Sequence, residues 1–293
     1  MEKSYDVIIV GAGPAACSGA VFLARANVKT LFIGDPAHSG LADAAEVLNY
    51  AGFNKSISGR DLLEQMNEQA TAQGATFLKG EVVHTEKTAK GTFLARTASR
   101  EEFFANNLLL AHGANYIKVN LPGEIELVGK TVHYCALCDG PLYKGKEVVV
   151  LGNGNFAAEE ALQLAGMGVK VAQIITQARE ANIAKSYTDA LAKAGIPVVV
   201  ARLETFEEGS DTVYFVALGV ASSHAFAKKL GLEMNGNFLK ADRNGRTNVA
   251  GVWVAGLARG GVNQVAKSVG EGASAAVDII KVVKGLPQYI DHT

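Results

Sequence analysis

The chain has 293 residues, a length that favours two domains over one. With 48% hydrophobic and 19% charged residues it can bury a large core, which excludes a disordered protein. The net charge of −1 predicts no nucleic-acid or membrane-surface partner through bulk charge, and no uncharged apolar run approaches the ~18–20 residues of a membrane span. No secretory signal precedes the first strand pattern, so we expect a cytoplasmic location.

The N-terminal third predicts a β-α-β unit that continues into further strands. Its elements are a buried strand over 6–10, a helix over 15–26 and a strand over 29–33. A helix over 60–73, antiparallel strands within 76–96 and a buried strand over 107–111 follow.

A second β-α-β unit begins at the strand over 147–151. Its helix covers 157–167 and its next strand 170–175. The remaining predicted elements are a helix over 183–193, strands over 196–201, 212–218 and 251–255, and a long helix over 264–284. Two nucleotide-type units in one chain indicate an α/β protein with an internal duplication.

A glycine-rich turn joins the first strand to the first helix. Gly11, Gly13, Pro14 and Ala15 belong to a G-x-G-x-x-A pattern, which places a tight turn and a helix N-terminus against a pyrophosphate. The acid that binds the ribose in such units follows the second strand. Asp35 stands one place late for this role, and an ordinary turn before Pro36 explains it equally well.

The second glycine-rich turn contains Gly152, Gly154, Asn155 and Phe156. It repeats the pattern, but the bulky Phe156 would lie where a pyrophosphate should bind. The strand that follows ends without a clear acid for NAD or arginine for NADP, although Arg179 is close. We interpret this second nucleotide site as degraded or repurposed.

Cys135 and Cys138 form a C-x-x-C pair that is followed directly by Asp139. Such a pair can close a small disulfide ring and lower a thiol pKa, and Asp139 is a candidate general acid or base for the leaving thiol. A single C-x-x-C provides too few ligands for structural zinc even with His133 nearby, so we expect no metal. The third cysteine, Cys17, has the character of a small packed hydrophobe.

Together these motifs resemble the low-molecular-weight thioredoxin reductases over nearly the whole chain. The segments that carry the resemblance are 11–16, 46–53, 111–114, 135–140, 152–160 and 251–276. The resemblance implies two Rossmann-like, three-layer (ββα-type) domains, the second inserted in the first. It implies an FAD-binding domain over 1–115 and 242–293 and a pyridine-nucleotide-like insert over 116–241. It also implies a homodimer with thioredoxin as partner.

By the same resemblance, Cys138 is the cysteine nearer the flavin, Cys135 attacks the partner's disulfide and Asp139 is the acid. A helix that starts after Gln264 is expected to point at the flavin and stabilise negative charge on its reduced form. The residues expected to bind FAD are Gly11, Gly13, Pro14, Ala15, Asp35, Gly40, Leu41, Asn49, Ala111, His112, Gly113, Gly256, Asn263, Gln264, Val265 and Tyr289.

Several departures from the family pattern concern the electron supply. The arginine-bearing stretch of the family is replaced by residues 176–178, and residues 198–218 look shortened, which argues against NADPH as reductant. Leu257 stands where the family has an aspartate that holds the flavin ribitol. Divergent branches with such features take electrons from ferredoxin or hold a second flavin, and a C-terminal aromatic such as Tyr289 can cover the flavin. A frayed terminus explains that tail equally well.

The sequence therefore favours an FAD-dependent enzyme that passes electrons from flavin through Cys135 and Cys138 to a protein disulfide. The donor is expected to be ferredoxin or a second flavin (a second FAD) rather than NADPH. Two alternatives stay open: a flavin-dependent dithiol oxidase, which runs the same parts in reverse, and a non-enzymatic flavin electron-transfer or sensor module.

Overall fold

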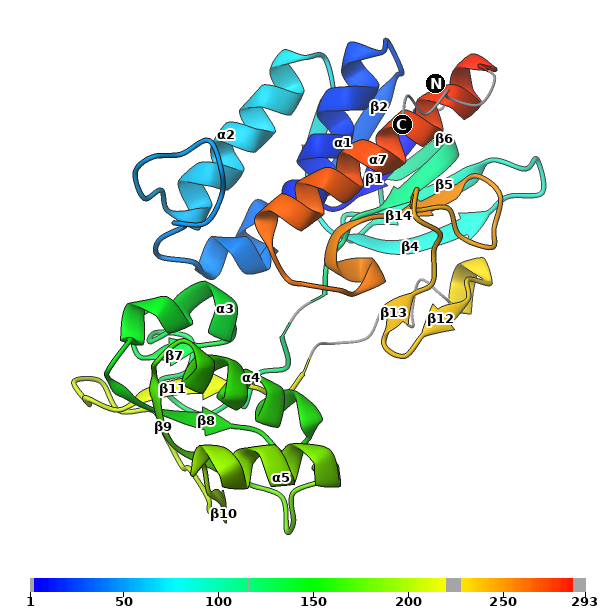
Figure 1. The fold of residues 1–293 in the computed structure, drawn as a ribbon. Coiled ribbons are helices and arrows are strands. Elements are labelled where there is room, and N and C mark those ends of the chain that lie inside the picture. Colours follow the sequence, from blue (N-terminus) through cyan, green and yellow to red (C-terminus); the bar gives the residue numbers. More distant parts are fainter. Residues whose placement is uncertain (1–2, 115, 220–227, 287–293) are drawn as a thin grey trace, which may run out of the picture. The chain divides into compact units, whose positions relative to one another are not determined.

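The computed structural model describes residues 3–114, 116–219 and 228–286, and its ribbon is shown in Figure 1. The chain divides into two compact units, one formed by Met1–Ala114 with Ser222–Thr293 and the other by Asn115–Ala221. We call them unit 1 and unit 2. Each has its own sheet and its own core.

Unit 1 is built on a seven-stranded sheet whose centre is parallel. Its strands are β1 (Ser4–Val10), β2 (Thr30–Gly34), β3 (Thr76–Lys79), β4 (Val82–Lys87), β5 (Phe93–Thr97), β6 (Glu102–Leu110) and β14 (Val252–Val254). Their order is β3-β2-β1-β6-β5-β4, with β14 also paired to β6. The predicted strands are present, with ends that differ by a few residues.

One predicted pairing is wrong in part. The sequence predicted antiparallel strands throughout 76–96, but β3 lies parallel to β2, with Phe32 opposite Phe77. Only β4 and β5 form an antiparallel hairpin, which continues onto β6. The turn between β3 and β4 therefore carries the chain out of the parallel sheet. The alternating pattern of both segments could not reveal this, because it is typical of either direction.

The central strands of unit 1 are buried on both faces. Val7 and Ile9 belong to one hydrophobic cluster, whereas Ile8 and Val10 belong to another. This is why the strand is apolar at every position from Val7 to Val10. The helices α1 (Pro14–Arg25), α2 (Gly59–Ala72) and α7 (Val265–Lys284) lie together over one face of this sheet (Figure 1).

Unit 2 contains a five-stranded, fully parallel sheet in the order β10-β9-β8-β11-β7. Its strands are β7 (Val132–His133), β8 (Glu147–Leu151), β9 (Lys170–Thr176), β10 (Val198–Val200) and β11 (Val213–Val216). Its helices are α3 (Ala136–Asp139), α4 (Asn155–Gly166) and α5 (Lys185–Ala194). Both units are thus Rossmann-like α/β structures, as the sequence predicted.

The chain returns to unit 1 before residue 242. Leu230, Leu232 and Leu239 are buried in the same cluster as Ile8 and Val10. The last of these lies in β13 (Phe238–Leu239), which pairs with β12 (Met234–Asn235). Hydrophobic contacts therefore place this segment with unit 1, whereas the sequence assigned residues up to 241 to the insert. Within the described ranges, no helix is both long enough and apolar enough to cross a bilayer.

Candidate redox centre and nucleotide sites

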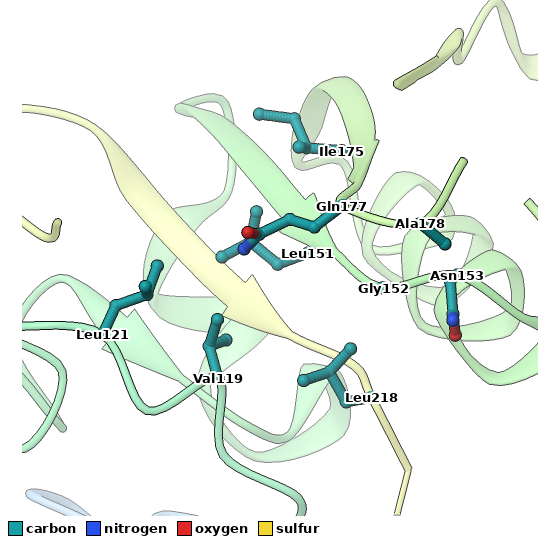
Figure 2. Close-up of a pocket in the computed structure, with 9 residues that line it drawn as sticks. All are labelled: Val119, Leu121, Leu151, Gly152, Asn153, Ile175, Gln177, Ala178 and Leu218. Atoms are coloured by element: carbon teal, nitrogen blue, oxygen red, sulfur yellow. The ribbon is translucent and has the colours of Figure 1, made fainter. Parts of the chain in front are cut away.

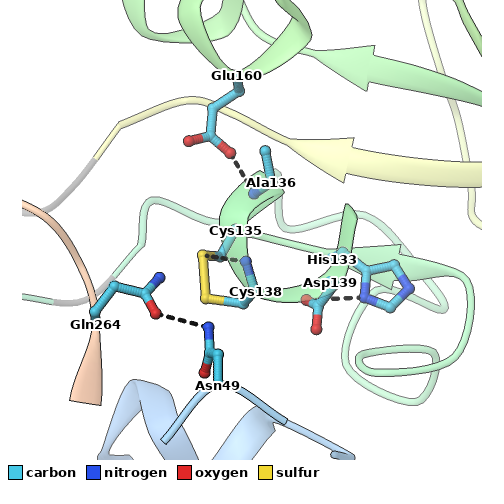
Figure 3. The surroundings of a disulfide bond; sticks show 8 residues. All are labelled: Asn49, His133, Cys135, Ala136, Cys138, Asp139, Glu160 and Gln264. Carbon is cyan, nitrogen blue, oxygen red and sulfur yellow. Dashed lines mark hydrogen bonds and ion pairs between the residues drawn. A yellow bond between two sulfur atoms is a disulfide. The ribbon is translucent and has the colours of Figure 1, made fainter. Parts of the chain in front are cut away.

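The two cysteines of the C-x-x-C motif begin a short helix in unit 2. Cys135 precedes α3, and Cys138 lies within it, with a disulfide between them and Cα atoms 5.3 Å apart. The backbone N–H of Cys138 donates to Sγ of Cys135 at 3.2 Å, as drawn in Figure 3. When the pair is reduced, a donor in this position stabilises a thiolate on Cys135.

A buried carboxyl group lies directly behind this helix. Glu160 on α4 accepts a 2.6 Å hydrogen bond from the backbone N–H of Ala136, the residue after Cys135 (Figure 3). Burial, opposed by the Ala136 hydrogen bond and assisted by the charge of the neighbouring Glu159, raises the pKa of Glu160 to about 7. Sequence reasoning missed this residue, because 24 positions separate it from its partner.

Asp139, the predicted acid, faces a second buried group. Its Oδ2 lies 3.1 Å from Nδ1 of His133, a side chain that is only 2% exposed. The imidazole stacks on Phe215 and meets the ring of Tyr143 edge-on. The structure thus joins Asp139 to a histidine that the sequence singled out only as a possible metal ligand. An apolar strand carrying one histidine two places before the cysteine was the available signal.

The predicted FAD contacts of unit 1 gather at one edge of its sheet. Val10 pairs with Ile33 and with Leu110, and Leu110 pairs with Val254, so β1, β2, β6 and β14 end together. Residues at the carboxyl ends of parallel strands line the ligand crevice in such sheets. Gly11, Asp35, Ala111, His112, Gly113 and Gly256 all follow directly from these ends.

The first glycine-rich turn fits the pyrophosphate of FAD. Gly11 has φ +131°, and a methyl group there would collide with the carbonyl oxygen of Ala111. Gly13 caps α1, whose first turn receives no side-chain hydrogen bond, and Pro14 is its first residue. A Cβ on Gly13 would meet only Oγ of Ser39, at 3.3 Å. The helix N-terminus is therefore accessible to an anion, as such a site requires.

Two predicted flavin contacts that are far apart in sequence meet in unit 1. The side-chain amide of Asn49 donates to Oε1 of Gln264 at 2.9 Å. Val265 then begins α7, which has no side-chain cap at its N-terminus. Burial lowers the pKa of His112 to about 4, so this imidazole is neutral at neutral pH.

Three of the predicted contacts, Asp35, Gly40 and Leu41, occupy the loop after β2. Asp35 accepts from the backbone N–H of Ala37 at 3.0 Å and lies 3.7 Å from the ammonium of Lys79. The turn role considered for Asp35 is thus present. Gly40 and Leu41 begin the 3-10 turn Gly40–Asp43, where a Cβ on Gly40 would enter open space.

A carboxylate from another part of the chain lies next to Leu257, the position where the family has an aspartate. It belongs to Glu271. Glu271 on α7 accepts from the backbone N–H of Gly256 at 2.9 Å and pairs with Lys267 at 3.0 Å. Lys267 in turn donates to the carbonyl oxygens of Gly256 and Gly260. The loop that follows β14 is therefore held by a lysine and a glutamate, which sequence comparison at Leu257 alone could not find.

Unit 2 has a pocket at the ends of β8 and β9, with a volume of about 240 Å³ (Figure 2). None of the nine described residues that line it carries a charge. They are Val119, Leu121, Leu151, Gly152, Asn153, Ile175, Gln177, Ala178 and Leu218. Arg179 is exposed and is not among them. A phosphate group would find no cation in this lining.

The second glycine-rich turn is tied to the chain's own loop. The N–H of Asn182 donates to the carbonyl of Asn153 at 2.7 Å, and the N–H of Ala184 donates to Oδ1 of Asn155 at 2.7 Å. Gly154 forms a bridge with Asn182. The half-buried ring of Phe156 packs against the core of unit 2.

Tyr289 lies outside the described residues. Among the described residues, no group of three or more His, Cys, Asp or Glu side chains is arranged to hold a metal ion. Cys17 is buried, and burial raises its thiol pKa to about 12, as expected for a packed residue.

A sequence model of the pyridine nucleotide-disulphide oxidoreductase family matches residues 5–272. The chain belongs to this family, which makes it an FAD-dependent disulfide oxidoreductase. Thioredoxin reductase of Bacillus subtilis (strain 168) is 33% identical over 313 aligned positions, covering 99% of this chain and 98% of the relative. That of Treponema pallidum (strain Nichols) is 35% identical over 299, covering 94% and 96%.

Among solved structures, the atypical thioredoxin reductase TRi from Desulfovibrio vulgaris Hildenborough is 35% identical, with a TM-score of 0.58. It covers 99% of this chain and 100% of its own. The thioredoxin reductase of Streptococcus pyogenes MGAS5005 is 24% identical with a TM-score of 0.87, which supports the fold. The chain is thus a thioredoxin-reductase-like enzyme.

Proposed function

We propose that this enzyme reduces a thioredoxin-type disulfide through Cys135 and Cys138, and that its flavin receives electrons from a donor other than NADPH. The observation that supports a donor other than NADPH is the uncharged pocket of unit 2 (Figure 2). NADPH carries a 2′-phosphate, a group that FAD lacks and that such sites bind with an arginine. Reduced ferredoxin or a second flavin are the donors that we infer instead.

The two glycine-rich turns support this division of roles. A methyl group is tolerated at both Gly13 and Gly154. The second turn differs in its bonds to a loop: Gly154 is bridged to Asn182, and its neighbours are hydrogen-bonded to residues 182–184. Gly11, Gly13 and the N-terminus of α1 would hold the FAD pyrophosphate. The bound flavin supplies two-electron transfer to a disulfide.

The residues of unit 2 then carry out thiol–disulfide exchange. Reduction breaks the Cys135–Cys138 bond with two electrons and leaves two sulfur atoms to be protonated or held as thiolates. The N–H of Cys138 stabilises the Cys135 thiolate, which attacks a sulfur of the partner's disulfide and displaces the other as a thiolate. Cys138 then attacks Sγ of Cys135, which releases the reduced partner and restores the disulfide.

The experiment is a single-turnover assay with dithionite-reduced holoenzyme. Mixed anaerobically with oxidised thioredoxin, the reduced enzyme should release dithiol thioredoxin. Cys138→Ser should abolish this release, because the mixed disulfide between Cys135 and thioredoxin is then not resolved. Cys17→Ser is the matched control and should react normally, because Cys17 is buried in unit 1. Thioredoxin reduction that survives in Cys138→Ser would overturn the relay.

A dithiol oxidase would use the same uncharged pocket and the same cysteine pair. It differs in consuming oxygen when it is given a small dithiol. We expect oxygen uptake to be much slower than thioredoxin reduction by the pre-reduced enzyme. Rapid uptake with no thioredoxin reduction would replace our proposal with the oxidase.

A further inference from the structure

The imidazole of His133 is enclosed by unit 2 and has polar neighbours at both ring nitrogens. It stacks on Phe215 at 5.2 Å between centroids and contacts the edge of Tyr143 at 5.0 Å. Its Nε2 lies 2.7 Å from the Tyr143 hydroxyl and 3.2 Å from the carbonyl oxygen of Lys130. The Tyr143 hydroxyl also donates to that carbonyl, at 2.8 Å.

These contacts place a proton on Nε2. The Lys130 carbonyl can only accept, and the single Tyr143 hydrogen is directed to it. Nε2 must therefore donate, either to the Tyr143 oxygen or to the carbonyl. With the proton on Nε2, all three groups are satisfied; without it, a bare nitrogen would face a carbonyl oxygen in a buried site.

The other nitrogen, Nδ1, then faces the acid of the redox centre. Oδ2 of Asp139 lies 3.1 Å away, at ion-pair distance although not along an ideal N–H···O line (Figure 3). A neutral His133 protonated on Nε2 would point its Nδ1 lone pair at a carboxylate. One further proton, on Nδ1 or on the carboxyl, turns this repulsion into an attraction.

We propose that His133 and Asp139 share one proton, and that this pair delivers it to the thiolate that leaves during exchange at Cys135–Cys138. Asp139 donates the proton to the leaving thiolate. His133 is a positioning residue that stabilises the protonated form of the pair before exchange. This proposal rests on the proposed function and deepens it. Tyr143 and the Lys130 carbonyl link the pair toward the surface, because Lys130 is exposed.

In the exchange step, the thiolate of Cys138 attacks Sγ of Cys135 in the mixed disulfide. The Cys135–Cys138 bond forms, the bond to the partner's sulfur breaks, and the electron pair leaves on that sulfur. The proton of the Asp139–His133 pair neutralises it. The pair is then an imidazole and a carboxylate, and it regains a proton from solvent by way of Tyr143.

The other groups that face His133 do not compete for this proton. Burial and the charge of Asp139 raise the pKa of Tyr143, which keeps its hydroxyl neutral. The Lys146 ammonium lies 5.5 Å from the Tyr143 ring centroid, and Phe215 on β11 carries no charge. Among the described residues, Asp139 on α3 is therefore the one acidic side chain that contacts the imidazole of His133.

The test compares two small disulfides that differ in leaving group. Enzyme with its cysteine pair reduced by dithiothreitol and then desalted is mixed with hydroxyethyl disulfide, whose alkyl thiolate needs a proton. The aromatic disulfide dithiobis(nitrobenzoate) releases a low-pKa thiolate that leaves without one. For His133→Asn we expect the first rate to fall about tenfold or more near neutral pH and the second to change less than about twofold.

The pH profile provides a second measurement. In the wild type the rate with hydroxyethyl disulfide should fall as the pair loses its proton, and in His133→Asn this fall should move to lower pH. His84→Asn is the matched control, because His84 forms an exposed pair with Glu86 in unit 1. If His133→Asn does not fold, Tyr143→Phe should show the same selective loss, of about threefold.

Equal slowing of both disulfides, or an unchanged pH profile, would overturn the shared proton while leaving the cysteine relay intact. A wild-type pair that reacts with neither disulfide would overturn the relay itself, and this proposal with it. The two failures are therefore distinguishable without thioredoxin or an electron donor.

Discussion

Glu160 accepts a 2.6 Å hydrogen bond from the backbone N–H of Ala136, which ties α4 to the first residue of the redox helix. Burial raises the pKa of this carboxyl to about 7. The group behind the cysteine pair thus titrates in the range where thiol exchange takes place.

This titration predicts a pH-dependent stability. The folded pKa of Glu160, about 7, lies above its ordinary value of 4.5, so the folded state holds the proton more tightly. The resulting contribution to the free energy of unfolding is fully present below about pH 4.5 and is lost as the pH rises to about 7. The difference between the two pKa values corresponds to about 3 kcal/mol of stability. Glu160→Gln should abolish this loss and unfold at higher urea than the wild type at about pH 8.

The exposed neighbour Glu159 is the control, because Glu159→Gln removes a similar charge without removing a buried one. Urea unfolding followed by circular dichroism across the pH range measures both variants. A wild type and a Glu160→Gln variant with the same pH dependence would contradict the buried titration.

The two glycine-rich turns predict different effects of the same substitution. Gly13→Ala adds a methyl group that the protein tolerates, at 3.3 Å from Ser39, but that enters the expected pyrophosphate position. We expect a folded protein that loses most of its FAD. In Gly154→Ala the methyl group lies 3.7 Å from the Asn182 carbonyl, and FAD content should be unchanged. The absorbance of flavin released by acid measures both, and equal FAD content in the two variants would argue against the assignment.

Cys17 should be chemically silent in the folded protein. Burial raises its thiol pKa to about 12, so at about pH 8 only about one thiol in 10⁴ is ionised. Iodoacetamide should therefore label Cys135 and Cys138 of the reduced native protein, and Cys17 only after unfolding. Mass spectrometry of tryptic peptides reads the result, and rapid native labelling of Cys17 would be inconsistent with this burial.

Buried Asp278, with its ion pair to the half-exposed Arg246, should be a stability determinant of unit 1. Asp278 is 3% exposed, accepts from Nε1 of Trp253 at 2.8 Å and is paired with Arg246. Asp278→Ala should cost about 1–3 kcal/mol, because it leaves a buried indole N–H without its acceptor, whereas the half-exposed guanidinium of Arg246 is solvated. Trp253→Phe, which removes one donor only, should cost less. Urea unfolding compares them, and a loss below about 1 kcal/mol for Asp278→Ala would refute this role.

Local patterns were sufficient to predict the β-α-β units and both glycine-rich turns, because their signals lie within about 20 consecutive residues. The direction of β3 was not predictable from its alternation. Contacts between distant residues were also missed. Glu160 behind Ala136, Glu271 at Gly256 and the loop at Asn182 each depend on how separate elements pack.

His133 shows the same limit at the redox centre. The sequence placed it two residues before Cys135, where a metal site was the only role considered. Its pairing with Asp139 and Tyr143 needs the turn of α3 and the following 3-10 segment Gly140–Tyr143, which bring these two side chains to one ring. This convergence follows from tertiary structure, and the sequence indicated it only through one histidine two places before Cys135.

The electron supply is the central claim, and anaerobic flavin spectroscopy tests it most directly. Holoenzyme is mixed with excess NADPH, excess NADH or reduced ferredoxin, and the loss of flavin absorbance is followed in a stopped-flow instrument. We predict no rapid bleaching by NADPH, and reduction by ferredoxin unless a second flavin is the donor, in which case acid release gives two flavins per chain. Complete bleaching by NADPH within the time of one turnover would contradict the account.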